Sequence, residues 1–229
     1  MSYFRFSTYT RDELVRCGES FKKDIISYVD ILNLFTTYQW TDFVIHWFAC
    51  AAPYPAGNSI ITYAHEPRAS TPWQTLCGDK EIARREPGPR NHGEFLLDLT
   101  HVDVEPMPVM TQGGWTAWAT RIRLGLESEW GHQASPRYNI ERVLIDAAKL
   151  AAVRAQAKVM IFASTNTQNR DDIVECLSRL RSTSDDSVPW LWFDIPWTWD
   201  RRITRWEPAF GLVDAPETTK SEEPSIPRV

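Results

Sequence analysis

The sequence has few of the residues that mark disulfide-bonded or zinc-binding proteins. Among its 229 residues are four cysteines, Cys17, Cys50, Cys77 and Cys176, which lie far apart without a Cys-x-x-Cys pair. A chain of this length does not need disulfides to stabilise its core, so we expect reduced, mostly buried thiols. The five histidines show no ligand spacing such as His-x-x-x-His. These absences argue against a disulfide scaffold and against a zinc site.

The sequence also lacks long apolar runs and an excess of basic residues. No run approaches the roughly 18 to 20 apolar residues of a membrane span, and residues 1–10 contain no apolar signal region. We therefore expect a cytoplasmic protein without a membrane partner. The net charge of −5 argues against a surface that is basic overall, because phosphate binding depends on Lys and Arg.

A local basic groove stays open as an interpretation. Arginines cluster in two segments, one with Arg84, Arg85 and Arg90 and the other with Arg201, Arg202 and Arg205. Ordinary solvated loop charges are the simpler explanation for both clusters.

Length and composition allow one large domain, since 43% of the residues are hydrophobic and 24% are charged. Residues 214–229 are mostly Pro, Glu, Ser and Thr, so they lack the apolar burial that offsets ordering entropy. We expect a single domain over residues 1–213 and a disordered tail over 214–229. Within the domain, N-terminal helices cover 10–52 and the core covers about 59–200.

Hydrophobic periodicity predicts the elements of this domain. A capping box at residues 10–13 begins a helix with apolar residues near every fourth position, so Glu13 is expected to be a cap rather than a catalyst. Further helices are predicted over residues 41–52, 138–156 and 170–181. Strands are predicted over residues 59–63, 94–102, 118–129, 158–163 and 190–195. This order predicts an α/β fold with helices flanking a sheet.

Two carboxylates stand where the strand over residues 118–129 ends. Glu127 and Glu129 are two residues apart, so they share one face of an extended strand. Without a cation they would repel each other and one would take up a proton, whereas a hard divalent ion would keep both ionised. Asp98 adds a single acid within the apolar strand over residues 94–102. The alternatives are two solvated strand-end carboxylates and a hydrogen-bonded structural aspartate.

Asp98, Glu127 and Glu129, followed by a long helix and a buried strand, resemble the motifs of the PD-(D/E)XK nuclease superfamily. The resemblance covers about residues 59–163 and is strongest over 124–163. It implies a restriction-endonuclease-like central mixed sheet flanked by helices, with all three acids as catalytic and metal-binding residues for Mg²⁺ or Mn²⁺. Glu129 stands where the family usually has Lys, although some type II restriction endonucleases carry Glu-x-Glu followed by Trp, as here.

The resemblance implies a Mg²⁺-dependent endonuclease that hydrolyses phosphodiester bonds, with DNA ahead of RNA as its substrate. A divalent ion suits this reaction because it stabilises charge on phosphoryl oxygens and supplies hydroxide near neutral pH. Lys149 is a candidate for a relocated catalytic lysine on the helix over 138–156. A helical wheel places it opposite the apolar face, which favours a solvated side chain. Asp146 and Asp103 are weaker candidates for the site.

Two other functions stay open. A catalytically inactive nuclease-fold protein would act as a binding or assembly module through the tryptophans of residues 190–206, with a homodimer or another protein as its partner. Packing is the more common use of tryptophan, however. A glycan hydrolase ranks last, because two acids side by side on one strand poorly serve the roughly 5 to 9.5 Å geometry of that reaction.

Overall fold

Six strands form one mixed sheet in the computed structural model, in the order β1-β2-β3-β4-β5-β6. The structure describes residues 4–28, 32, 36–52, 60–64, 97–111, 114–131, 135–183, 187–196 and 207–213, with the backbone alone for 60–64, 104–111 and 114–119. The strands are β1 Ile60–Ala64, β2 Leu99–Thr111, β3 Gly114–Glu129, β4 Ala155–Phe162, β5 Trp190–Asp194 and β6 Ala209–Leu212. Strands β3, β4 and β5 are parallel, and the other neighbours are antiparallel. The predicted α/β class with flanking helices is confirmed.

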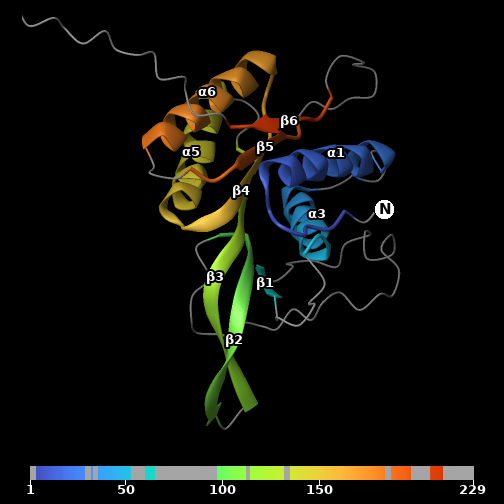
Figure 1. Cartoon of the computed structure of the whole chain (residues 1–229). Helices are drawn as coiled ribbons and strands as arrows, with labels where there is room; N and C mark the ends of the chain where they lie inside the picture. The colour runs from blue at the N-terminus through green and yellow to red at the C-terminus, as the bar shows by residue number, and fades with distance from the viewer. Residues whose placement is uncertain are drawn as a thin grey trace, which may run out of the picture.

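Helices cover both faces of the sheet. Helices α1 (Arg11–Ser27) and α3 (Thr37–Cys50) lie on one face, and α5 (Pro136–Ala152) and α6 (Thr167–Thr183) lie on the other (Figure 1). A hydrophobic core lies on each face of the sheet. Successive residues of a strand contribute to opposite cores, because their side chains point to opposite faces. Val159 and Ile161 pack with α1 and α3, whereas Met160 and Phe162 pack with α5 and α6.

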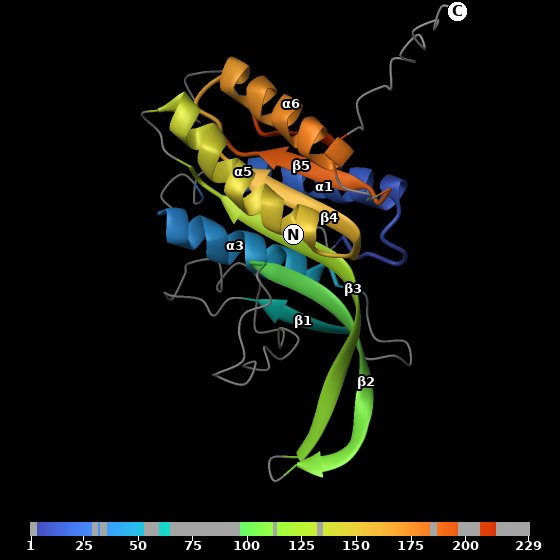
Figure 2. The ribbon, with the colours of Figure 1, turned by 90° about the vertical axis from the view of Figure 1, so that its left-hand side faces the viewer.

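The β2–β3 hairpin extends beyond the rest of the sheet. β1 pairs with β2 only at Leu99–Asp103, and β4 pairs with β3 only from Ile122 onward. The outer part of the hairpin therefore projects from the body as a two-stranded arm, as Figures 1 and 2 show. The register shifts between Pro106 and Met110, where prolines cannot donate ladder hydrogen bonds. The strand expected from residue 118 thus begins four residues earlier, at Gly114.

Two helix boundaries and the last strand also differ from the prediction. The helix expected over 138–156 ends at Ala152, because Ala155 pairs with Ile122 at the start of β4. The helix expected from residue 41 starts at Thr37, after a capping box of Thr36 and Gln39. β6 follows the strand that was expected to be the last. The predicted tail over 214–229 lies outside the described residues.

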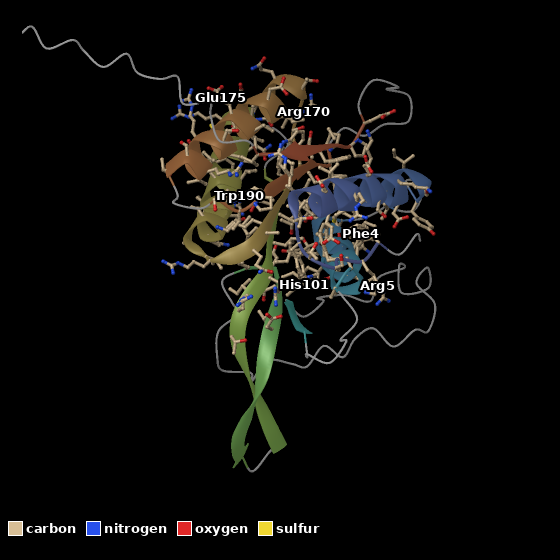
Figure 3. The ribbon with its side chains drawn as sticks, viewed as in Figure 1. Phe4, Arg5, His101, Arg170, Glu175 and Trp190 are labelled. Carbon is tan, nitrogen blue, oxygen red and sulfur yellow. The ribbon has the colours of Figure 1, made fainter. Side chains whose placement is uncertain are left out.

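A buried histidine joins the base of the hairpin to the N-terminal segment and α3. Nε2 of His101 donates to the Phe48 carbonyl at 2.9 Å, so Nδ1 accepts from the Tyr9 hydroxyl at 2.8 Å. Burial lowers the pKa of His101 to about 4, which keeps the ring neutral. Figure 3 shows His101 at the base of the hairpin.

The structure also bears on the expectations for Glu13, for the cysteines and for membrane-spanning helices. Glu13 accepts hydrogen bonds from the backbone of Ser7, Thr8 and Tyr9, which makes it a structural cap of the N-terminal turn. Cys17 is buried and unpaired, while Cys50 and Cys176 are half-buried, and Cys77 lies outside the described residues. Within the described parts of the chain, no helix is both long and apolar enough to span a bilayer.

Candidate active site

The predicted acids lie where β2 begins and β3 ends, on the side of the sheet that α5 covers. Leu99 pairs with Leu126, so this register brings Asp98 beside the end of β3. Oδ2 of Asp98 accepts hydrogen bonds from the Ser128 amide at 2.8 Å and the Ser128 hydroxyl at 2.7 Å. Asp98 therefore lies at a bend just before β2 rather than inside a strand as predicted. Burial raises its pKa, although the two Ser128 bonds oppose this shift.

Glu127 is the most enclosed acid of the site, with 1% of its surface exposed. Within the described residues its Oε1 atom is buried without a hydrogen-bond partner. Burial and then the charge of Asp98 raise the pKa of Glu127 to about 9. At neutral pH the side chain therefore holds a proton unless a cation takes its place.

Lys149 joins this site, contrary to the helical-wheel prediction. Its Nζ lies 3.7 Å from Oε2 of Glu127 and 2.6 Å from Oδ1 of Asp146. Lys149 flanks the buried side of α5, and its long aliphatic stem lets the ammonium reach the acids. Burial works against its charge, but the hydrogen bond to Asp146 and the nearby carboxylates raise its pKa above the ordinary value. Lys149 is therefore a cation at neutral pH.

Asp146 is the residue that sequence reasoning undervalued. Besides its contact with Lys149, its charge raises the pKa of both Asp98 and Glu127. One feature of the sequence could have indicated its role. Arg142, Asp146 and Lys149 are spaced at i, i+4 and i+7, which puts them on one side of the helix. Only the docking of α5 against β3 shows that this side meets the strand acids.

Glu129 has hydrogen-bond partners of its own, Gly131 and Arg142. Its Oε1 accepts from the Gly131 amide at 2.6 Å, and Arg142 contacts both of its oxygens at 3.1 and 3.3 Å. The turn depends on Gly131, which has a φ of 59°, a left-handed conformation that favours glycine. Burial raises the pKa of Glu129, while Gly131 and Arg142 oppose the shift.

The positions of these acids decide which of them could bind Mg²⁺ together. In the described chain, no group of three or more His, Cys, Asp or Glu side chains is arranged to hold a metal ion. Mg²⁺, however, usually takes one or two carboxylates together with water and substrate phosphates. Asp98 and Glu127 supply such a pair, and Glu127 offers the partnerless buried oxygen. The residues fit a two-carboxylate site, whereas the predicted third ligand, Glu129, is bound to Arg142 and Gly131.

The remaining sequence candidates do not join the site. Asp103 pairs with Arg123 at 2.6 Å across the β2–β3 ladder, which gives it a structural role. Trp190 is fully buried under α5 and α6, as the packing interpretation predicted. Several candidates lie outside the described residues, namely Arg84, Arg85, Arg90, Arg201, Arg202, Arg205, Trp197, Trp199 and Trp206.

Comparison with known proteins gave no relatives. No family model matches the chain, and searches of curated proteins and of solved structures also found no match. Function is therefore inferred from the geometry of the site.

Proposed function

We propose that the protein is a Mg²⁺-dependent nuclease that hydrolyses phosphodiester bonds, with DNA ahead of RNA as its substrate. The observation that carries the proposal is the meeting of Asp98 and Glu127 with Lys149, which comes from the helix after the acidic strand. A paired carboxylate site and a fixed cation are the two parts that a metal-assisted attack on a phosphate needs.

The order of the elements supports the same proposal. Strands β1, β2 and β3 form an antiparallel meander, and α5 returns the chain to β4, which is parallel to β3. This is the arrangement expected of the restriction-endonuclease-like fold, and we assign the chain to that fold as part of the proposal. The cytoplasmic location remains a prediction from the sequence.

Each side chain has a role that follows from its surroundings. Asp98 and Glu127 would hold Mg²⁺ or Mn²⁺, which when bound polarises the phosphoryl oxygens and acidifies a water molecule. Lys149 keeps its proton, so it stabilises negative charge on the phosphate and takes over a role of the lysine absent at residue 129. Glu129, with its raised pKa, is suited to accept the proton of the attacking water.

The proposal is tested by incubating the purified full chain with plasmid, single-stranded DNA and RNA in Mg²⁺ or Mn²⁺. We expect metal-dependent cleavage that falls by roughly 10²- to 10⁴-fold in Glu127→Gln and Lys149→Met. The matched control is Glu141→Gln, an exposed acid of α5 that contacts Arg137 and should leave the rate unchanged. Cleavage that survives Glu127→Gln would exclude this site as its source.

The second candidate function is a nuclease-fold protein without activity that acts as a binding or assembly module. The engagement of Glu129 by Arg142 favours it, because this ion pair occupies the carboxylate that a nuclease would need as its base. Absence of cleavage on every substrate, together with absence of metal binding by calorimetry, is the result that would select this candidate.

A further inference from the structure

Four residues of α5 form one exposed row beside the acids, which we name the α5 stripe. They are Tyr138, Arg142, Ile145 and Lys149, spaced at i, i+4, i+7 and i+11. Tyr138 is 45% exposed and Ile145 is 65% exposed, an unusual degree for a large apolar side chain in the middle of a helix. Arg142 and Lys149 are 46% and 38% exposed. Aromatic, cationic and apolar groups thus alternate along a surface that solvent reaches.

The stripe borders the proposed active site along the helix. Nε of Arg142 lies 3.1 Å from Oε1 of Glu129, and Nζ of Lys149 lies 3.7 Å from Oε2 of Glu127. These two contacts fix the rotation of the stripe relative to the end of β3. A polymer strand that extends from this site along α5 would meet the stripe.

The side chains of the stripe suit a nucleic-acid strand. The guanidinium of Arg142 lies 6.0 Å from the centre of the Tyr138 ring, so a phosphate group and a base can be held next to each other. Arg142 and Lys149 are seven residues apart, a rise of about 10.5 Å along the helix. That length corresponds to about three nucleotide steps of 3.4 Å in one strand.

We infer that the α5 stripe binds one strand of the nucleic-acid substrate beside the scissile phosphate. Arg142 contacts a backbone phosphate, Tyr138 stacks on a base, and Ile145 contacts the strand between the two cations. The inference rests on the proposed nuclease function. It also links binding to chemistry, because Arg142 must leave Glu129 to reach a phosphate and so frees that carboxylate.

The local charges set the conditions for binding. The carboxylates of Asp98, Glu129 and Asp146 lie near the stripe and oppose a phosphate when ionised, while Arg142 and Lys149 are paired with acids. A divalent cation between Asp98 and Glu127 would offset this repulsion. We therefore expect strand binding to be tighter in Ca²⁺ than in EDTA.

The test is fluorescence anisotropy of labelled single-stranded DNA and RNA oligonucleotides with the full chain in Ca²⁺, over a range of salt concentrations. Arg142→Gln is expected to weaken binding and to lower the salt slope by about 0.7, the loss of one phosphate contact on a single strand. Tyr138→Ala is expected to weaken binding by roughly tenfold or more with an unchanged slope, and Tyr138→Phe to retain it.

The matched control is Arg137→Gln, which removes a more exposed arginine of the same helix, off the stripe and paired with Glu141. Its affinity and salt slope should equal those of the wild type. Equal losses in Arg137→Gln and Arg142→Gln would overturn the inference, because general electrostatics would then explain binding. If the wild type cleaves but every stripe variant binds as tightly as the wild type, the inference is overturned while the proposed function stands. A wild type that neither binds nor cleaves would overturn the proposed function as well.

Discussion

At the scale of single residues, Glu127 decides how the site behaves. A carboxyl group that is 1% exposed and raised to a pKa of about 9 cannot ionise at neutral pH without help. Lys149 is close, yet at 3.7 Å it does not lower the pKa to the ordinary range. The partnerless Oε1 and the raised pKa both describe a group that a proton or a cation must neutralise.

This leads to a prediction for metal binding. Binding of Mn²⁺ should release about one proton at pH 7, and its affinity should rise by about tenfold per pH unit below pH 9. Titration calorimetry in buffers of different ionisation enthalpy measures the released proton directly. Glu127→Gln should abolish the release, whereas the exposed Glu141→Gln should not. Binding with the same affinity at pH 6 and pH 8 would contradict this role of Glu127.

At the scale of elements, α1 packs closely against β6 at Gly18. A Cβ atom added to Gly18 would overlap Cδ2 of the Phe210 ring. The Phe210 ring is stacked on Phe193 of β5 at a centroid distance of 5.9 Å, so it has little room to move aside. The absent side chain of Gly18 is what lets α1 approach the edge strand.

Gly18→Ala is therefore expected to destabilise the fold by about 1 to 3 kcal/mol, despite the better helix propensity of alanine. In a Phe210→Ala background the same substitution should instead stabilise the protein by about 0.5 to 1 kcal/mol, because the clash is gone. Urea unfolding of the four proteins measures this coupling. If the two substitutions change the free energy of unfolding additively, a side chain at residue 18 does not clash with Phe210.

At the scale of the whole molecule, buried polar groups tie the two layers of helices to the sheet. Asp194, at the end of β5, is fully buried and accepts hydrogen bonds from the Ser164 amide at 2.9 Å and the Ser164 hydroxyl at 2.7 Å. These bonds hold the segment between β4 and α6 against the next strand. Burial raises the pKa of Asp194 to about 6, above its ordinary value of 3.8.

The pH dependence of global stability follows from this shift. The folded protein keeps the Asp194 proton up to about pH 6, whereas the unfolded chain loses it near pH 4, so burial of Asp194 costs most above pH 6. Asp194→Asn keeps an acceptor for the Ser164 amide and should be more stable than the wild type above pH 6, by at most roughly 3 kcal/mol. This difference should shrink towards pH 4. Thermal unfolding between pH 4 and pH 8 measures it.

The control for this prediction is Glu175→Gln, an exposed acid of α6 that pairs with Arg179. Its stability curve should run parallel to that of the wild type across the pH range. Parallel curves for Asp194→Asn and the wild type would show that Asp194 does not titrate differently in the folded protein.

Local patterns were enough to predict most of the elements. The period of 3.6 identified α5, and runs of apolar residues identified β4 and β5, because these signals depend only on neighbouring residues. The predicted ends of elements were wrong where contacts with residues distant in sequence determine them. Residues 153–156 were predicted as the end of the alanine-rich helix over 138–156, but β4 starts at Ala155 because β3 offers it a parallel partner.

The sequence by itself determined that Glu127 and Glu129 share a face of one strand, since alternation is a property of extended backbone. Only the tertiary structure decided which acids meet. The β2–β3 register places Asp98 against Ser128, and the docking of α5 brings Lys149 to Glu127 and Arg142 to Glu129. These contacts join residues 13 to 30 positions apart, so no local pattern contains them.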